Sequence, residues 1–319
     1  MKYVRLGNSG LEVSQICLGC MSFGTPGKLF DWCVDEQKAE AILKTAIDLG
    51  INFFDTANVY TDGEAEEFMG RILKRIASRD EIVIATKCGL NMDKNHGPNR
   101  AGCSRKHIFD EVEKSLKRLD TDYIDLYYVH RYDPHTPLEE TMKALNDLVE
   151  NGKVRYIGAS NFPAWAFCKA QAIAEKHGWA KFICLENKHN LLNRQDEKEV
   201  FPMLEYEGAS YVPYQVLAGG RFSRKEGEIT SRSQTQSEQN ISYHSQNDAI
   251  ISRRVEELAE KYGCSKANII VAYELSKPAT SSIIIGTTNP DRLRDTVKGI
   301  DIHLTPEDIA YLEELYLPR

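Results

Sequence analysis

The sequence predicts an α/β fold, a (β/α)8 TIM barrel with an N-terminal β-hairpin and an extra C-terminal helix. Eight short β-rich runs alternate with amphipathic helical stretches, which is the rhythm of a parallel sheet. Polar residues stand at or just after the ends of three of these runs, at the rim where barrel enzymes collect their catalytic groups. One barrel of about 250 residues with extensions accommodates the chain, so we expect a single domain over residues 1–319.

The first residues are expected to form the hairpin. Its two strands are Val4-Arg5 and Leu11–Val13, around the turn Asn8-Ser9-Gly10, and the hairpin could plug the bottom of the barrel. The eight barrel strands then follow as short runs with strand-like composition. They are Gln15–Leu18, Asn52–Asp55, Ile82–Lys87, Ile124–Val129, Val154–Ala159, Phe182–Asn187, Ala209–Tyr214 and Ser282–Ile285.

Helical patterns fill the intervals between the strands. They cover Asp35–Leu49, Glu64–Ile76, Ser104–Leu119, Pro137–Asn151, Pro163–His177, Asp196–Gly208 and Asn247–Tyr262. Pro290–Lys298 should be the last barrel helix, and Thr305–Leu315 the appended one, with Thr305 as its N-cap. Residues 215–248 include a long polar loop, which fits either a lid over a cofactor or disorder.

Composition and charge narrow the class of protein. The hydrophobic fraction of 42% provides a large core, and a net charge of −7 argues against a nucleic-acid partner. The chain has no apolar run near the roughly 18 residues of a membrane span, and its eight cysteines show no framework pattern, so we expect a cytoplasmic protein. Cys17 and Cys20 form a C-x-x-C without a second pair, and we expect no metal. The oligomeric state is not readable.

Four polar residues carry the chemistry. Asp55, Tyr60, Lys87 and His130 stand at or just after the ends of three successive expected strands. A tyrosine protonates an oxygen at neutral pH only if its surroundings ease proton loss, and a neighbouring ammonium does so. Lys87 is the candidate cation, Asp55 its counter-ion, and His130 a donor that orients a carbonyl oxygen. Together they suit carbonyl reduction by proton donation coupled to hydride delivery.

These residues lie in motifs that resemble the aldo/keto reductase family. The resemblance runs from about Tyr3 to Leu315. The matching stretches are LGCMSFG (Leu18–Gly24), GINFFDTANVY (Gly50–Tyr60), the strand ending in Lys87, DLYYVHRYDPHTPLEET (Asp125–Thr141), GKVRYIGASNF (Gly152–Phe162) and IIIGTTNPDRL (Ile283–Leu293). The resemblance implies the barrel fold, a nicotinamide cofactor bound without a Rossmann domain, and Tyr60 as general acid in a tetrad with Asp55, Lys87 and His130.

The resemblance also implies the cofactor contacts. Ser160 and Asn161 match a pair that binds the nicotinamide carboxamide, and Tyr214 matches the aromatic residue on which the ring stacks. Arg292 would pair with the adenosine 2′-phosphate, because a guanidinium binds phosphate in a fork geometry. NADP(H) is therefore favoured, with NAD(H) as the alternative. The full implied set is Gly19, Cys20, Met21, Asp55, Ser160, Asn161, Glu186, Tyr214, Gln215, Leu217, Lys225, Gly286, Thr287, Thr288, Arg292 and Asp295.

The chain departs from the family pattern in three places. Glu186 stands where the family has glutamine, and a carboxylate accepts hydrogen bonds but does not donate them. Gln215-Val216 replaces a Ser-Pro after the stacking aromatic, and Gly286 replaces a lysine of some members. The first two departures put the cofactor contacts at those positions in question, and the third leaves 2′-phosphate recognition to Arg292.

We expect an enzyme that reduces an aldehyde or ketone, or runs the reverse oxidation, on a small-molecule substrate. Tyr60, His130, Trp32 and Tyr132 are the expected substrate contacts, although Trp32 and Tyr214 also fit ordinary packing aromatics. Taken alone, Lys87 fits a Schiff-base lysine and His130 a core histidine. The alternative function is an NADP(H)-binding regulatory or sensor subunit with little turnover. The sequence does not identify the substrate.

Overall fold

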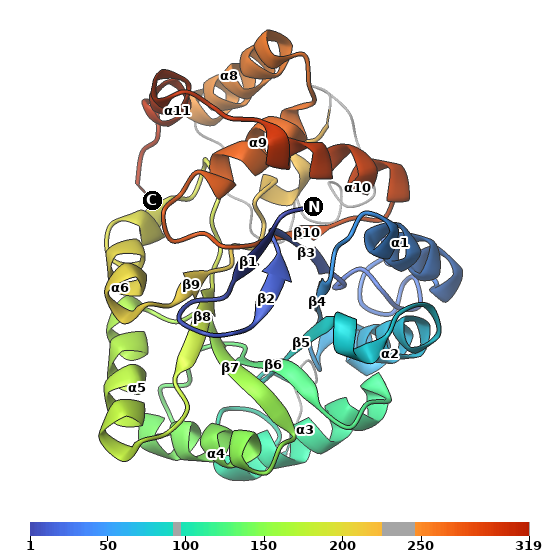
Figure 1. Ribbon diagram of the computed structural model, residues 1–319, viewed down its shortest axis with the longest axis vertical. Coiled ribbons are helices and arrows are strands. Elements are labelled where there is room, and N and C mark those ends of the chain that lie inside the picture. Colours follow the sequence, from blue (N-terminus) through green and yellow to red (C-terminus); the bar gives the residue numbers. More distant parts are fainter. Residues whose placement is uncertain (92–96, 225–245, 319) are drawn as a thin grey trace.

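Eight parallel strands form one sheet in the order β10-β3-β4-β5-β6-β7-β8-β9 (Figure 1). The structure is a computed structural model that describes residues 1–91, 97–224 and 246–318. The Tyr211 amide donates to the Ala279 carbonyl (2.7 Å) and the Ile284 amide to the Pro213 carbonyl (2.9 Å), so the two ends of the sheet meet and the barrel closes. The strands are β3 (Ile16–Gly19), β4 (Phe53–Asp55), β5 (Val83–Cys88), β6 (Ile124–Val129), β7 (Val154–Ser160), β8 (Phe182–Glu186), β9 (Ser210–Tyr211) and β10 (Ile283–Gly286).

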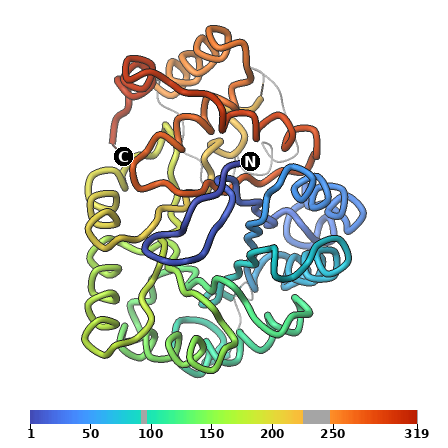
Figure 2. The backbone as a smooth tube through the Cα atoms, viewed as in Figure 1, coloured from blue at the N-terminus to red at the C-terminus, as the bar shows by residue number. Residues whose placement is uncertain are grey.

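The helices pack around the outside of the sheet, as the ribbon and the tube both show (Figures 1 and 2). Side-chain caps begin several of them, since Asp35, Ser104 and Thr305 each accept from a backbone amide of the first turn. Within the described residues the α-helices are α1 (Glu36–Asp48), α2 (Glu64–Ile76), α3 (Arg105–Leu119), α4 (Leu138–Glu150), α5 (Ala164–His177), α6 (Val200–Glu207), α8 (Gln246–Tyr262), α9 (Lys266–Leu275), α10 (Pro290–Thr296) and α11 (Pro306–Glu313).

These elements confirm the predicted barrel, with two main differences and smaller shifts in the ends of other elements, such as α6, which begins at Val200 and not at Asp196. Helix α9 was not predicted, because eight consecutive residues from Ala267 to Glu274 are buried and the segment therefore lacks amphipathic periodicity. The seventh strand is shorter than the expected Ala209–Tyr214, since Pro213 has no amide hydrogen for the sheet. The Tyr214 amide still donates to the Asn187 carbonyl (3.0 Å), so this segment stays beside β8 and carries Tyr214 to the rim.

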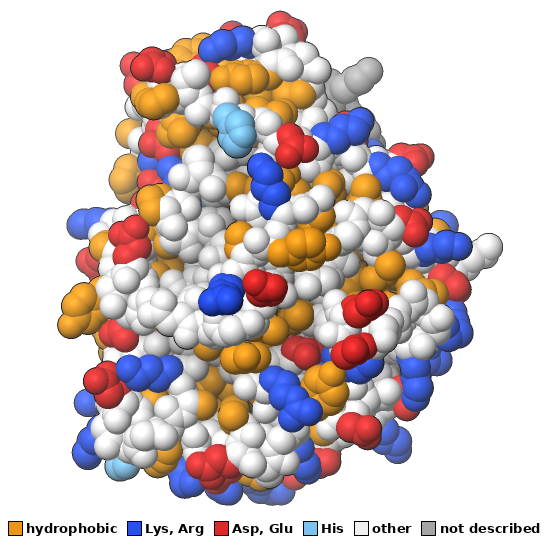
Figure 3. Space-filling model, viewed as in Figure 1, with side chains coloured by type: hydrophobic (Ala, Val, Ile, Leu, Met, Phe, Trp, Pro, Cys, Tyr) orange, Lys and Arg blue, Asp and Glu red, His pale blue; other side chains and the backbone are white. Residues whose placement is uncertain are grey.

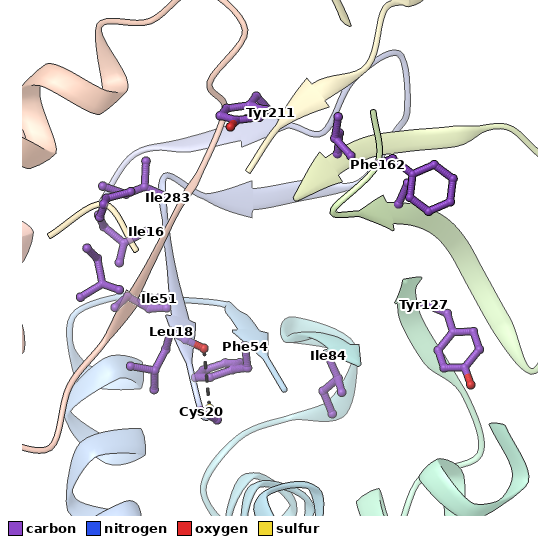
Figure 4. Close-up of a cluster of buried hydrophobic side chains, with 14 of the residues drawn as sticks. Ile16, Leu18, Cys20, Ile51, Phe54, Ile84, Tyr127, Phe162, Tyr211 and Ile283 are labelled. Carbon is purple, nitrogen blue, oxygen red and sulfur yellow. Dashed lines mark hydrogen bonds between the residues drawn. The ribbon is translucent and has the colours of Figure 1, made fainter. Parts of the chain in front are cut away.

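The core has two layers, one inside the barrel and one between the barrel and the helices. Neighbouring residues on a strand alternate between them: Phe53 and Tyr128 point into the barrel, and Phe54 and Tyr127 point outward. Figure 4 shows part of the outer layer, with Ile16, Leu18, Phe54 and Ile283 close together. Both layers are removed from water, which fixes the register of the strands and hence the positions of the residues at their ends.

The N-terminal hairpin closes one end of the barrel. Strands β1 (Tyr3–Arg5) and β2 (Glu12–Ser14) pair antiparallel, and Figure 1 shows them lying across the middle of the ring of strands. Leu6 and Val13 are fully buried against the residues inside the barrel. The Asn8 amide donates to the Gly208 carbonyl (2.7 Å), which ties the hairpin to the entry of β9. The predicted plug therefore lies at the N-terminal ends of the strands, opposite the functional rim.

Acidic and basic side chains are interspersed on the face drawn in Figure 3, without a continuous basic stripe on that face. None of the helices in the described ranges is both long enough and apolar enough to span a bilayer.

Replacing Leu6 tests the hairpin's contribution to the core. Leu6→Ala is expected to lower the free energy of unfolding by about 3 kcal/mol, because a fully buried leucine leaves a cavity. Leu317→Ala is the matched control, since Leu317 is 61% exposed, and it should change stability by less than about 0.5 kcal/mol. Urea denaturation of both variants measures the difference. Equal effects would contradict the packing described here.

Candidate active site

A cavity of about 810 Å³ opens at the C-terminal ends of the strands and collects most of the predicted site residues. This volume suits a ligand the size of a cofactor. The predicted residues that line it are Gly19, Met21, Trp32, Asp55, Tyr60, His130, Asn161, Glu186, Tyr214, Gln215, Leu217, Gly286, Thr287, Thr288, Arg292 and Asp295.

A buried ion cluster underlies one end of the cavity. Lys87, near the end of β5, is fully buried, and its Nζ lies 2.5 Å from Asp55 Oδ1 and 3.4 Å from Glu186 Oε1. It also donates to the Thr56 carbonyl (3.0 Å). Burial alone would lower the pKa of Lys87, but the two carboxyl groups outweigh it and hold that pKa well above its usual value. Lys87 is therefore an ammonium ion.

The two carboxyl groups of the cluster differ. Burial raises the pKa of Asp55, and the short ion pair with Lys87 opposes this rise. Burial, reinforced by the charge of Asp55, raises the pKa of Glu186 to about 8, and Lys87 offsets only part of that rise. Asp55 makes the shorter contact with Lys87 and is therefore its closer counter-ion.

Tyr60 begins the 3-10 helix η1 (Tyr60–Gly63), which follows β4. Its ring centroid lies 5.4 Å from Lys87 Nζ and 5.9 Å from the His130 ring, which meets it edge-on at 87°. Burial raises the pKa of Tyr60, and the ammonium of Lys87 acts in the opposite direction. Lys87 thus acts on the pKa of Tyr60 in the expected direction, but burial has the larger effect in the protein without substrate. The phenol is therefore neutral and can donate a proton.

His130 directly follows β6 and is neutral. Burial lowers its pKa well below the usual value, and the charges of Lys87 and Arg131 lower it further. Its Nδ1 is buried and has no hydrogen-bond partner in the described part of the chain. A neutral imidazole carries one N–H donor and one acceptor nitrogen, so His130 can bind a carbonyl oxygen without bringing a second positive charge to the cavity.

Asn161 joins three strand ends. Its amide donates to the His130 carbonyl (3.0 Å) and to Ser160 Oγ (2.9 Å), and its Oδ1 accepts from the Tyr214 hydroxyl (2.8 Å). The backbone of Asn161 is left-handed, with φ of 52°, a conformation that asparagine adopts more readily than most residues. This geometry explains why an asparagine follows β7: it turns the chain and fixes the Tyr214 ring at the cavity wall.

The other end of the cavity is polar and carries side chains of both charges. Gly286, Thr287, Thr288, Arg292 and Asp295, which are predicted cofactor contacts, line it. Gly19 belongs to the wall of the same cavity, where a Cβ at this position would lie only 2.7 Å from Ile284 Cγ2. Glycine is therefore required where β3 meets β10.

The remaining predicted residues do not line the cavity. Lys87 and Ser160 are fully buried, as is Cys20, whose thiol points back to the Leu18 carbonyl (Figure 4). Tyr132 packs edge-on against Phe162 and Trp165. Lys225 lies outside the described residues, as does most of the 215–248 loop. Trp32 lines the cavity and stacks on Phe30 at 4.7 Å.

The sequence pattern of the aldo/keto reductase family matches residues 15–317. The chain belongs to this family. It is 41% identical to versiconal hemiacetal acetate reductase of Aspergillus parasiticus, covering all of this chain and 98% of the relative. It is 44% identical to a candidate aryl-alcohol dehydrogenase of Schizosaccharomyces pombe, covering 99% and 96%. It is 37% identical to the aldo-keto reductase AMT2 of Alternaria alternata, covering 98% and 91%.

Family membership confirms the resemblance read from the motifs and settles the class of reaction. The protein is an oxidoreductase that acts on CH–OH or carbonyl groups of small molecules. Aldo/keto reductases generally use nicotinamide cofactors, usually NADPH. The cavity fits such a group, because Glu186 Oε2 and Gln215 Oε1 are buried without partners among the described residues, and both side chains line the wall.

Several residues at the cavity were not predicted. Arg131 lines the cavity. Its position directly after His130 could have indicated this, because it places Arg131 at the same rim. Ser265, Lys266 and Ala267 line the end near Arg292 because they begin α9, the helix that the sequence did not reveal. Ser265 caps that helix through a capping box with Asn268, and this spacing is the signal that could have located it.

Removing the ammonium tests the ion cluster. Lys87→Met is expected to lower the free energy of unfolding by about 3–5 kcal/mol at neutral pH, because Asp55 and Glu186 lose their counter-charge. The pKa values of both carboxyl groups are already raised, so the loss should grow as pH rises. The double variant Asp55→Asn/Lys87→Met is the control and should recover part of the lost free energy of unfolding. Urea denaturation compares the three proteins, and native stability in Lys87→Met would contradict the buried pair.

Proposed function

We propose that this protein is an NADP(H)-dependent reductase that converts an aldehyde or ketone to an alcohol, or catalyses the reverse oxidation. One observation carries the proposal: a single cavity joins a neutral tyrosine beside a buried ammonium to a polar end that contains Arg292 and Lys266. All eight cysteines are free, which supports a cytoplasmic location for the enzyme.

The cofactor would lie between these two ends. When bound, the reduced nicotinamide supplies hydride from its C4 atom to the carbonyl carbon. Tyr214 offers its ring to the nicotinamide, while Ser160, Asn161 and Glu186 hold the carboxamide. Their adjacency supports this role, because Asn161 bonds to both Ser160 and Tyr214, and Ser160 pairs with Glu186 across the sheet.

Tyr60 would supply the proton. As hydride adds to the carbonyl carbon, the π electrons of the C=O bond move to the oxygen. That oxygen then takes the hydroxyl proton of Tyr60. Lys87 stabilises the phenolate that remains, and Asp55 keeps Lys87 charged. His130 donates its N–H to the carbonyl oxygen and directs it toward Tyr60. Proton uptake from solvent then restores the phenol.

The end of the cavity with Arg292 would select the dinucleotide. Arg292 would pair with a 2′-phosphate, with Thr287 and Thr288 on the same wall. Lys266 reaches this wall from the start of α9 and adds a second positive charge that the sequence pattern did not indicate. We infer NADP(H) as the preferred cofactor, with NAD(H) bound more weakly.

The substrate would carry an aromatic ring. Trp32, supported by Phe30, forms an aromatic wall of the cavity. The name of one relative, a candidate aryl-alcohol dehydrogenase, agrees with a ring-bearing substrate. Tyr132 packs edge-on against Phe162 and Trp165 and does not line the cavity, so it would contact the substrate only indirectly.

Tyr60→Phe separates catalysis from binding. It is expected to bind NADPH with native affinity and to lose at least about 10²-fold in kcat, because only the proton donor is removed. Fluorescence titration gives the affinity, and absorbance of NADPH at saturating aromatic aldehyde gives the turnover. Unchanged turnover would contradict the role of Tyr60. Tight NADPH binding by the native protein, with no turnover on aldehydes, ketosugars or ketosteroids, would favour a sensor instead.

Arg292→Ala tests recognition of the 2′-phosphate. The variant should weaken NADPH about 10²-fold while changing NADH less than about threefold, because a charge-assisted contact to phosphate is lost. Arg294→Ala is the matched control: Arg294 lies on the same helix, is half exposed and does not line the cavity. Equal losses for the two cofactors would mean that Arg292 does not read the phosphate.

A further inference from the structure

Glu186 is a second carboxyl group at the ion cluster, at the position where the family pattern has glutamine. It ends β8, is only 3% exposed, and pairs with Ser160 of β7. Its Oε1 faces Lys87 at 3.4 Å, whereas Oε2 is buried with no hydrogen-bond partner in the described ranges. Because Glu186 also lines the cavity, a buried polar group that lacks a partner stands at the wall where a ligand would lie.

The charges of the cluster do not balance if both carboxyl groups are ionised. Lys87 supplies one positive charge, and Asp55 holds the shorter contact with it, 2.5 Å against 3.4 Å for Glu186. A second ionised carboxylate in this buried space would lack a counter-charge, and two such neighbouring acids commonly share one proton. The geometry assigns the negative charge to Asp55 and the proton to Glu186, which without cofactor can donate that proton in a hydrogen bond to Asp55.

The other titratable groups that act on Glu186 do not alter this balance. The charge of Glu186 affects the pKa values of Tyr60, Tyr128 of β6 and Tyr214, and those of Cys17 of β3 and Cys184 of its own strand. Burial raises the pKa of each of these phenols and thiols, so all five are neutral near pH 8. Lys87 therefore remains the single cation that offsets Asp55 and Glu186 within this group.

We propose that Glu186 is held as a neutral carboxylic acid whose O–H turns from Asp55 to the nicotinamide carboxamide when the cofactor binds, so that ionisation of Glu186 weakens cofactor binding. A protonated carboxyl group has one donor and acceptor capacity, as the glutamine amide has, whereas a carboxylate only accepts. The acid thus replaces the amide of the family pattern at low and neutral pH and fails to replace it at high pH. This inference rests on the proposed function, since it concerns the same cofactor.

Titration with NADPH across pH tests the inference. The affinity of the native protein should fall about tenfold as pH rises through the pKa of Glu186, about 8, because a hydrogen bond is lost and a negative charge appears at the wall. Glu186→Gln keeps the donor at every pH, so its affinity should stay nearly constant over the same interval. This variant also controls for ionisation of the cofactor and of every other residue. An identical loss of affinity in both proteins would overturn the inference.

Thermal unfolding of the protein without cofactor gives an independent readout. The pKa of Glu186 is raised in the folded protein, so the folded state keeps a proton that the unfolded state loses above the ordinary carboxyl pKa. Native stability should therefore fall relative to Glu186→Gln as pH rises from that ordinary value to about 8, and the difference should then level off. The opposite slope would mean that Glu186 is an ionised partner of Lys87, and would overturn the inference.

The two measurements also separate this inference from the proposed function. Absence of NADPH binding in both proteins at every pH would remove the cofactor role, and with it the proposed function. Binding by the native protein that is strong and independent of pH would leave the proposed function intact and overturn only the role of Glu186.

Discussion

The buried ammonium of Lys87 organises the rim of the barrel. A charge removed from water needs partners close by, and those of Lys87 come from the ends of β4 and β8 and from the chain just after β4. The parallel sheet brings these strand ends together, and the alternation of side chains turns Lys87 toward the inside of the barrel. The hairpin at the opposite end completes the packing beneath it, so the chemistry of the site depends on a scaffold that extends through the whole barrel.

The same charge governs the protonation of its neighbours. It opposes the rise that burial causes in the pKa of Asp55, and it helps to keep His130 neutral. It also lowers the cost of forming a phenolate at Tyr60, although burial still dominates there. A neutral phenol beside a fixed ammonium is suited to giving up a proton only when an acceptor develops negative charge. In our proposal, that acceptor is the oxygen of the reduced carbonyl.

The sequence was most informative where chemistry and chain position coincide. Asp55 and His130 could be placed because each ends or follows an apolar strand, and the strand rhythm alone brings them to one rim. Helix α9 was not predicted, because eight consecutive residues in it are buried. For the same reason Lys266, which begins this helix, was not predicted at the cavity. The protonation of Glu186 could not be read from sequence at all, because it depends on distances to Asp55 and Lys87, which lie far from it along the chain.

A crystal structure of the complex with NADP+ would test the account most directly. We predict that the nicotinamide lies against Tyr214 with its carboxamide at Ser160, Asn161 and Glu186, its C4 atom facing the region between Tyr60 and His130, and the 2′-phosphate beside Arg292. A cofactor bound outside this cavity, or one with its adenosine end at Tyr60, would contradict the account.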